Sequence, residues 1–486
     1  MARRVIKNGS RHDENGWIRV DVSGSPREMG RAHGALLSNE ISSSIKTLDY
    51  VVLEETGIQM EVMADIIMHL YGDRVKTRYP ELMEEIESIV EGARSAGSKV
   101  TLNEVFLWNC WYSIGYVSSR LPALVAADPI LSEKYGHIFT DMAPGGGGSE
   151  GGGRDRCTGF IAVGDWTADG KIVCGHNTFD NFIDAQECNV MMAVRPSSGN
   201  SWIMQTSPGC VASGTDYYVT NNGFIVTETT IGGFNAFKLL DPVFCRIRKA
   251  VQRAKTLDDF TDILKDGNGG DYANSWLVGD IKNNEIMRIE LGLNYVNVEK
   301  KKNGYFIGFN APYDARIRNL ECSNTGFNDI RRHQGARQVR LEQLMTEHKG
   351  KISIGIGQDI LADHYDVYLN KENMCSRTCC SHYDLDQREY MSQAGRPLPY
   401  QPRGALDGIV TDSHMAKRMG LSARWGSSCG TPFIASEFCA RNIQWAPQLP
   451  YLVDRPFQPW THFYGRGSSK ATRSKRVKRS RGTRRR

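Results

Sequence analysis

The sequence lacks any apolar run of about 18 residues, the length that a helix needs to cross a bilayer. The first ten residues include basic side chains but no apolar segment of the kind found in a secretory signal. Twelve cysteines in 486 residues are too few for a disulfide scaffold. We therefore expect mostly buried thiols, and a cytoplasmic or nuclear protein rather than a secreted one.

The last 21 residues contain no acidic side chain. Residues 466–486 carry eleven Lys and Arg, so the rest of the chain has a net charge of −6 although the whole has +5. A segment this charged cannot fold alone, and it has no aromatic residues on which bases could stack. We expect a disordered basic tail that contacts nucleic acid or another anionic surface without sequence specificity.

The remaining sequence has the composition of a globular protein, with 40% hydrophobic and 24% charged residues. Apolar residues at helical spacing dominate the first third, beginning with a Ser25–Pro26 turn. After Cys157 the pattern changes to strands, one of them at 305–309, interrupted by helices at about 241–265 and 331–347. This order predicts an α+β fold in which helices cover an antiparallel sheet or a pair of sheets.

A glycine-rich connector separates these two parts. Seven of the nine residues 145–153 are glycine, which predicts a solvated linker; no lysine lies at the spacing of a phosphate-binding loop. The connector ends at Cys157, which opens a strand. If the chain is cut between Arg156 and Cys157, one residue supplies a thiol nucleophile and an α-amine base of reference pKa about 7.7–8.0. The alternative is an ordinary buried thiol in a strand.

A cysteine nucleophile of this kind also needs donors for the oxyanion of the tetrahedral intermediate. Polar residues embedded in strand-like sequence are the candidates. They form three groups, at residues 175–180, 227–230 and 272–276.

These motifs carry a family resemblance. Cys157-Thr-Gly-Phe, Gly175-His-Asn-Thr-Phe, Thr227-Glu-Thr-Thr-Ile-Gly and Gly270-Asp-Tyr-Ala-Asn-Ser-Trp occur in the order found in phospholipase B-like proteins, the lamina ancestor homologues. Residues 380–385 and 404–411 resemble that family's C-terminal segment, and residues 24–34 resemble the opening of the autoproteolytic acyltransferases of the penicillin-forming type. The resemblance covers about residues 20–460.

The resemblance implies an N-terminal nucleophile hydrolase, an αββα sandwich with a helical N-terminal segment. Its expected parts are a helical segment over 1–141, a connector with the cleavage site over 142–156, a hydrolase core over 157–465 and the basic tail over 466–486. Animal members reside in lysosomes, whereas the missing signal favours a cytoplasmic or nuclear location here.

The same resemblance assigns roles by motif. Cys157 is the nucleophile, with His176 beside it. Asn274 and a threonine of the pair Thr229 and Thr230 serve the oxyanion. The remaining assignments concern the pocket: Asn177, Thr178 and Phe179 line it, and Asp180 stands for an aspartate that flanks the nucleophile in related bile-salt hydrolases.

The implied reaction is hydrolysis of an amide or ester bond in an acylated substrate, such as a phospholipid, through an acyl-enzyme and without a cofactor. Two alternatives stay open. The same fold could transfer the acyl group to an amine, or the chain could be a non-catalytic protein that associates with nucleic acid through its tail.

A second cysteine-rich stretch contains Cys375, Cys379, Cys380 and His382. The spacing Cys-x3-Cys-Cys-x-His suggests a metal site but lacks the separated ligand pairs of zinc modules. We therefore expect a structural thiol group or one disulfide here, and no metal.

Overall fold

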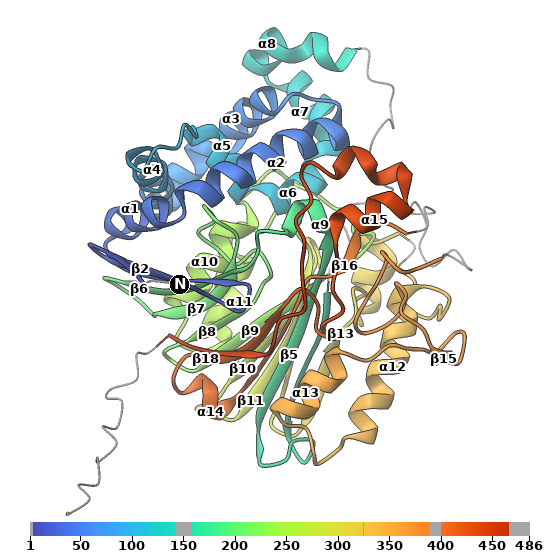
Figure 1. The fold of residues 1–486 in the computed structure, drawn as a ribbon. Coiled ribbons are helices and arrows are strands. Elements are labelled where there is room, and N and C mark those ends of the chain that lie inside the picture. The colour runs from blue at the N-terminus through green and yellow to red at the C-terminus, as the bar shows by residue number, and fades with distance from the viewer. Residues whose placement is uncertain (1–2, 141–156, 324, 388–399, 466–486) are drawn as a thin grey trace, which may run out of the picture.

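The computed structural model describes residues 3–140, 157–323, 325–387 and 400–465. Within them, two β-sheets lie face to face between layers of helices (Figure 1). The first third is mainly helical, and strands dominate after Cys157. The predicted α+β class, with an αββα layer order and helices near the N-terminus, is confirmed.

The larger sheet has ten strands in the described residues, and only the pairing of β3 with β6 is parallel. Three of its strands precede the first helix, so residues 4–24 belong to the sheet and not to the helical segment expected over 1–141. In spatial order, the strands are β1 (Arg4–Ile6), β2 (Gly9–Glu14), β3 (Trp17–Gly24), β6 (Val190–Pro196), β7 (Trp202–Thr206), β8 (Tyr218–Thr220), β9 (Phe224–Thr230), β10 (Asn274–Asp280), β11 (Glu285–Leu291) and β12 (Val296–Lys301).

The smaller sheet has β13 at one edge, and β13 directly follows β12 of the larger sheet in sequence. A separate two-stranded ribbon, β14 (Tyr365–Asp366) with β15 (Lys371–Glu372), lies outside both sheets. In spatial order, the smaller sheet contains β13 (Gly304–Gly308), β4 (Cys157–Gly164), β5 (Gly170–Asn181), β17 (Asp407–Asp412), β18 (Gly420–Trp425) and β19 (Thr461–Tyr464), with β16 (Arg403–Ala405) also beside β5.

Helices cover the outer faces of both sheets. On the larger sheet α1 contacts β3 and α11 contacts β11, whereas α12 and α13 contact the smaller sheet. The bounds are α1 (Pro26–Leu36), α2 (Ser38–Thr56), α3 (Met60–Arg78), α4 (Pro80–Ser95), α5 (Leu102–Asn109), α6 (Trp111–Val117), α7 (Leu121–Ala127), α8 (Pro129–Thr140), α9 (Phe182–Ala185), α10 (Val243–Arg253), α11 (Leu257–Lys265), α12 (His333–Glu347), α13 (Ile354–Leu361), α14 (Ser413–Ala416) and α15 (Ala435–Arg441).

Helix α1 begins where the Ser25–Pro26 turn predicts. Ser25 accepts a hydrogen bond from the backbone of Glu28, and the Glu28 side chain accepts one from the backbone of Ser25. The helix then crosses α4 closely, because Gly30 and Gly34 leave room for the backbone of that helix. A side chain at Gly34 would collide with the carbonyl oxygen of Ile89.

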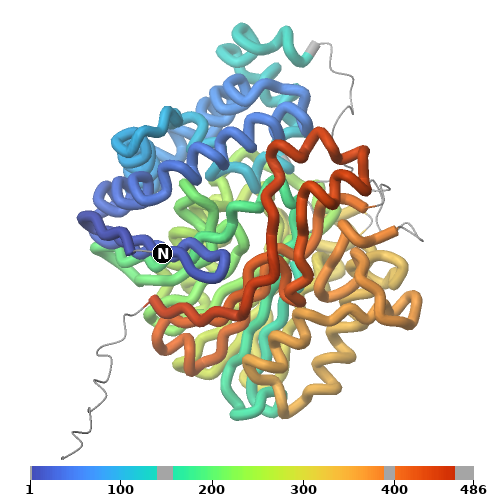
Figure 2. The backbone as a smooth tube through the Cα atoms, in the orientation of Figure 1, coloured from blue at the N-terminus to red at the C-terminus, as the bar shows by residue number. Residues whose placement is uncertain are grey.

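The two ends of the described chain meet at one edge of the molecule, where β19 lies beside the first strands (Figure 2). The Arg19 guanidinium donates to the carbonyl oxygen of Tyr464 at 2.6 Å. The rings of Trp17 and Phe463 pack edge to face with their centroids 5.8 Å apart. These contacts join the larger sheet to the smaller one.

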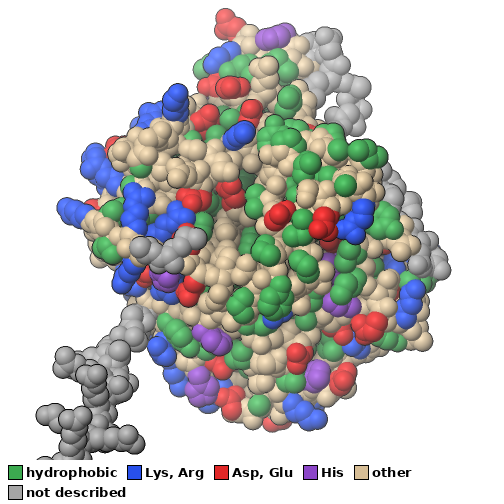
Figure 3. Space-filling model, in the orientation of Figure 1, with side chains coloured by type: hydrophobic (Ala, Val, Ile, Leu, Met, Phe, Trp, Pro, Cys, Tyr) green, Lys and Arg blue, Asp and Glu red, His purple; other side chains and the backbone are tan. Residues whose placement is uncertain are grey.

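Among the described helices, none combines the length and apolarity that a membrane span requires. Acidic and basic side chains are interspersed on the face drawn in Figure 3. The connector predicted over 142–156 and the basic tail predicted over 466–486 lie outside the described residues.

Candidate functional site

Cys157 is the first residue of β4, in the smaller sheet between β13 and β5. Its side chain is buried, with the residue only 1% exposed. Opposite it on β5 lies Thr178, and Gly159 lies opposite His176. Because directly paired residues of antiparallel strands point to the same face, Cys157, Thr178 and His176 share one face of the sheet.

The side chains on this face point into the space between the two sheets. A Cβ atom on Gly159 would lie 3.5 Å from Cγ2 of Thr229 and 3.6 Å from Cδ1 of Leu277, both on the larger sheet. Thr229 also packs against Gly308 of β13. The structure therefore brings Thr229 to the same layer as the face that carries Cys157.

Asn310, which follows β13, holds the backbone nitrogen of Cys157. Its Oδ1 atom accepts a hydrogen bond from that nitrogen at 3.3 Å, and its Nδ2 donates to the carbonyl oxygen of Thr230 at 2.8 Å. The residue has a φ of 67°, in the left-handed region that asparagine tolerates better than most residues. Asn310 thus links the start of β4 to the end of β9.

Arg337, on α12, holds the other backbone group of Cys157. Its fully buried guanidinium donates to the carbonyl oxygen of Cys157 and to Oγ1 of Thr158 at 3.1 Å. It also donates to Oδ1 of Asn310 at 2.7 Å. Both backbone groups of Cys157 are therefore fixed by buried side chains, from two different elements.

His176 is fully buried on β5. Burial lowers the pKa of its imidazole to about 3, although the backbone of Glu228 favours the charged form. The ring centroid is 6.3 Å from that of Tyr217. His176 is consequently a neutral group between the sheets at ordinary pH.

Asn274 and Thr230 belong to a polar group with Glu228 and Tyr272. Asn274 and Thr230 are paired across β10 and β9, and Thr230 points to the opposite face from its neighbour Thr229. Asn274 Nδ2 donates to Glu228 at 2.5 Å, and the hydroxyls of Thr230 and Tyr272 are 2.8 Å apart. Burial, followed by the nearby Asp216 carboxyl, raises the pKa of Glu228 well above its usual range.

Asn177 points to the outer face of β5, whereas its neighbour Thr178 points to the inner face. Its Nδ2 atom donates to the carbonyl oxygens of Leu361 at 3.1 Å and of Cys379 at 3.0 Å. The same atom is 3.1 Å from Oγ of Ser428. These bonds fasten loops to the sheet, and they occupy the side chain that the motif assigns to the pocket.

Phe179 and Asp180 are also buried at the end of β5. The Arg337 guanidinium lies 5.1 Å from the centre of the Phe179 ring. Asp180 Oδ1 is 3.8 Å from the guanidinium of Arg403. Of the motif residues, His176, Thr178 and Thr229 share the layer of Cys157. Asn177 and Phe179 support the smaller sheet from its outer face, and Asn274 and Thr230 point to the other face of the larger sheet.

The sequence reasoning missed Asn310 and Arg337. Asn310 directly follows the strand predicted at 305–309, so the sequence does mark it, as a polar residue at the end of a strand. Arg337 is one of several arginines in a predicted helix, and no pattern in the sequence distinguishes it from the others.

The second cysteine-rich stretch divides in the structure. Cys380 and His382 meet His364 and Cys429 in a group that could hold a metal ion. Cys375 instead lies 3.4 Å from a carboxylate oxygen of Asp366, and Cys379 packs in a hydrophobic core. No disulfide joins the cysteines of the described residues.

Comparison with known proteins gives one family match. The model of the phospholipase B family matches residues 77–450. An uncharacterized protein of Archaeoglobus fulgidus is 26% identical over 280 residues, which cover 56% of this chain and 42% of that protein. A putative phospholipase B-like 2 of Rattus norvegicus is 26% identical over 47% of this chain and 44% of its own length.

A phospholipase B of the snake Crotalus adamanteus is 25% identical over 43% of this chain and 40% of its own length. The chain thus spans less than half the length of these curated relatives. Among solved structures, a variant of a conjugated bile acid hydrolase from Clostridium perfringens matches 56% of this chain and 82% of its own chain, with 9% identity and a TM-score of 0.28.

Proposed function

This chain belongs to the phospholipase B family, and we propose that it hydrolyses an amide or ester bond of an acylated, lipid-like substrate, with Cys157 as the nucleophile. The observation that carries the proposal is the fixation of Cys157. Its N–H is held by Asn310 and its carbonyl oxygen by Arg337, both of them buried side chains. A cysteine with only a structural role in a strand does not need a buried guanidinium that donates to its carbonyl oxygen.

Before the first turnover, water hydrolyses the peptide bond between Arg156 and Cys157, which leaves a carboxyl group on Arg156 and frees the α-amine of Cys157. The amine then takes the proton of the Cys157 thiol, and the thiolate attacks the carbonyl carbon of the substrate. A thioester forms as the bond to the leaving alcohol or amine breaks, and the leaving group takes the proton. Water, activated by the same α-amine, hydrolyses the thioester and regenerates the thiol.

Asn310 is suited to orient the free amine, because Oδ1 already accepts a hydrogen bond from this nitrogen. Arg337 fixes Oδ1 and therefore fixes that orientation. Thr229 is the proposed donor for the oxyanion, whereas Asn274, which the motif also assigns to this role, points with Thr230 to the other face of the larger sheet and donates to Glu228. Neutral His176 and Thr178 line the inner face beside the nucleophile.

The thiol is closed off in the described arrangement, since Cys157 is only 1% exposed. A substrate therefore reaches the thiol only after residues that cover it move. We expect the cut before Cys157 to provide this movement, so that the intact chain is inactive and the cut chain is active.

The first test follows the fate of the chain on a denaturing gel, with sequencing of the new N-terminus. Cleavage gives a small chain of about 17 kDa and a large chain that begins Cys157-Thr158. Cys157→Ala should leave the chain whole if the thiol performs the cut, whereas Cys439→Ala, a buried cysteine of α15, should be cut normally. A wild-type chain that stays whole and unreactive in every preparation would contradict the proposal.

The second test identifies the substrate class. The cut protein is incubated with a panel of phospholipids and N-acyl amides, and the large chain is analysed by mass spectrometry for an acyl group on Cys157. Including a primary amine in the same reaction distinguishes hydrolysis from acyl transfer, because a transferase would release the acylated amine. The panel decides between ester and amide substrates by which of them leaves the adduct.

A further inference from the structure

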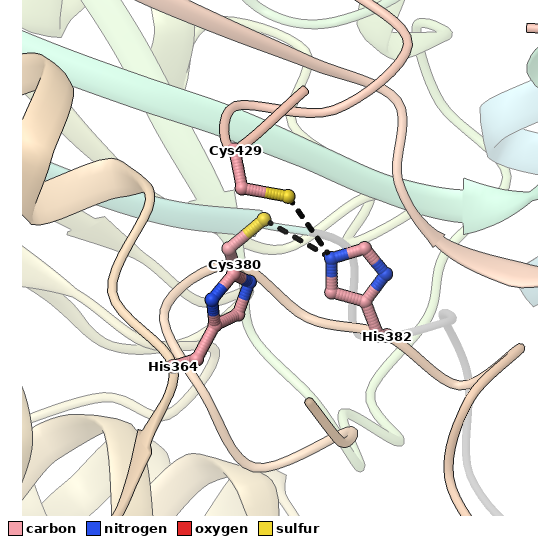
Figure 4. Close-up of side chains that lie close together, drawn as sticks. All are labelled: His364, Cys380, His382 and Cys429. Atoms are coloured by element: carbon pink, nitrogen blue, oxygen red, sulfur yellow. Dashed lines mark hydrogen bonds between the residues drawn. The ribbon is translucent and has the colours of Figure 1, made fainter. Parts of the chain in front are cut away.

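Four side chains from three separate stretches of the chain meet beside the outer face of β5. His364 lies between α13 and β14, Cys380 and His382 lie in the loop after β15, and Cys429 follows β18. One ligand atom from each lies within 4.8 Å of all the others, and Figure 4 shows the side chains converging. We call these four residues the Cys2His2 group.

Two separations in this group match those of a tetrahedral metal site. Nε2 of His382 is 3.5 Å from Sγ of Cys380 and 3.4 Å from Sγ of Cys429. Zinc–sulfur bonds of about 2.3 Å and zinc–nitrogen bonds of about 2.0 Å at tetrahedral angles place sulfur and nitrogen about 3.6 Å apart. The two observed distances are close to this value.

We infer that the Cys2His2 group binds one zinc ion in a closed, structural site. Two thiolates and two imidazoles form a donor set that suits zinc and is poorly matched to magnesium or calcium, which prefer oxygen ligands. All four positions are supplied by the protein, as in structural zinc sites, so no position is open for a substrate.

The surroundings orient the ligands. Nδ1 of His382 lies 3.3 Å from Oδ1 of Asp384, so a carboxylate can fix the ring while Nε2 faces the two sulfur atoms. The backbone N–H of Thr431 donates to Sγ of Cys429 at 3.4 Å. Nε2 of His364 is a buried nitrogen, and the ring interacts with the Cys429 side chain, as expected for two ligands of one ion.

The zinc ion would fasten two loops to the strand behind the nucleophile. Cys379, next to the ligand Cys380, accepts a hydrogen bond from Asn177 through its carbonyl oxygen. Ser428, next to the ligand Cys429, contacts the same Asn177 and donates to the carbonyl oxygen of Leu361 at 2.6 Å. Asn177 lies between Thr178 and His176 on β5, so the metal would stabilise the strand that pairs with Cys157.

The test measures metal in the full chain, purified under reducing conditions without chelator. We expect about one zinc ion per chain by elemental analysis, and after exchange for cobalt(II) we expect the thiolate-to-cobalt charge-transfer absorption of two Co–S bonds. The inference is overturned if the folded chain holds no zinc and gives no such absorption when reloaded with either metal. A Cys380–Cys429 disulfide, detected as a cross-linked peptide under non-reducing conditions, overturns it equally.

Variants locate the ion. Cys380→Ser and Cys429→Ser should each lower the bound zinc at least tenfold, whereas Cys439→Ser should retain it. If the two variants fail to fold, the cobalt spectrum of the wild-type chain still counts the thiolates. Zinc that is retained by both folded variants would show that it binds elsewhere and would refute the site.

Discussion

Oδ1 of Asn310 lies 3.3 Å from the backbone nitrogen of Cys157. The same oxygen receives the Arg337 guanidinium at 2.7 Å, and Arg337 also donates to the carbonyl oxygen of Cys157. Two side chains that are distant in sequence thus hold the first residue of β4 by both of its backbone groups. This relationship motivates the first two predictions.

Replacing Arg337 with lysine keeps the charge but removes the planar fork that reaches Cys157, Thr158 and Asn310 together. We expect the rate of acyl-enzyme formation to fall about 10²-fold, because a displacement of about 1 Å at the nucleophile costs that much. The measurement is the single-turnover rate of the cut protein. The control is Arg340→Lys, on the same helix, which alters a part-buried ion pair with Asp363 beyond α13 and should change the rate far less.

Replacing Asn310 with aspartate changes the charge beside the α-amine and keeps a residue that tolerates the left-handed backbone. A carboxylate near an ammonium stabilises the charged form, so the pKa of the amine should rise. The amine acts as a base only when neutral, and the acidic limb of the pH–rate profile should therefore move to higher pH. Asn303→Asp, at an exposed contact with Asp165, should leave the profile unchanged. An unmoved limb in Asn310→Asp would show that this amine is not the base.

The sequence predicts the elements of this fold better than it predicts the contacts between them. The helix expected at 331–347 is α12 (His333–Glu347), and the strand at 305–309 is β13 (Gly304–Gly308), because both have local periodicity. The approach of Arg337 and Asn310 to Cys157 depends instead on how α12 packs on the smaller sheet. No local pattern records that packing.

The second cysteine-rich stretch illustrates the same limit. Cys380 and His382 are two residues apart, but the ligands that complete their group, His364 and Cys429, are 16 and 49 residues from Cys380 in sequence. Spacing rules detect paired ligands in short modules. They cannot detect a site that the fold assembles from three stretches.

His176 should make stability depend on pH in a defined range. Burial lowers its pKa to about 3 in the folded chain, against about 6.5 when unfolded. Between these values the unfolded chain binds the extra proton, so the stabilising contribution is complete above pH 6.5 and is lost as the pH falls toward 3. Between pH 6.5 and pH 3, the free energy of unfolding of His176→Gln should decrease by about 3–5 kcal/mol less than that of wild type.

The matched control is His33→Gln. Burial also lowers the pKa of His33 to about 3, but this histidine accepts a hydrogen bond from Gly209 and lies on α1. Its replacement should flatten the stability curve similarly. Neither variant should move the acidic limb of the pH–rate profile, because both histidines are neutral where the α-amine titrates. A limb that moves in His176→Gln alone would give His176 a direct role in proton transfer.

The close crossing of α1 and α4 gives a prediction for stability alone. A methyl group at Gly34 would collide with the carbonyl oxygen of Ile89, and a backbone atom of a packed helix cannot move aside cheaply. Gly34→Ala should therefore lower the free energy of unfolding by about 2 kcal/mol or more. Gly355, in α13, has nothing within 4 Å of the same added group, so Gly355→Ala should stabilise by about 0.5–1 kcal/mol through helix propensity. Urea denaturation of both variants measures the difference in the free energy of unfolding. Equal midpoints would mean that α1 and α4 can move apart without loss of stability.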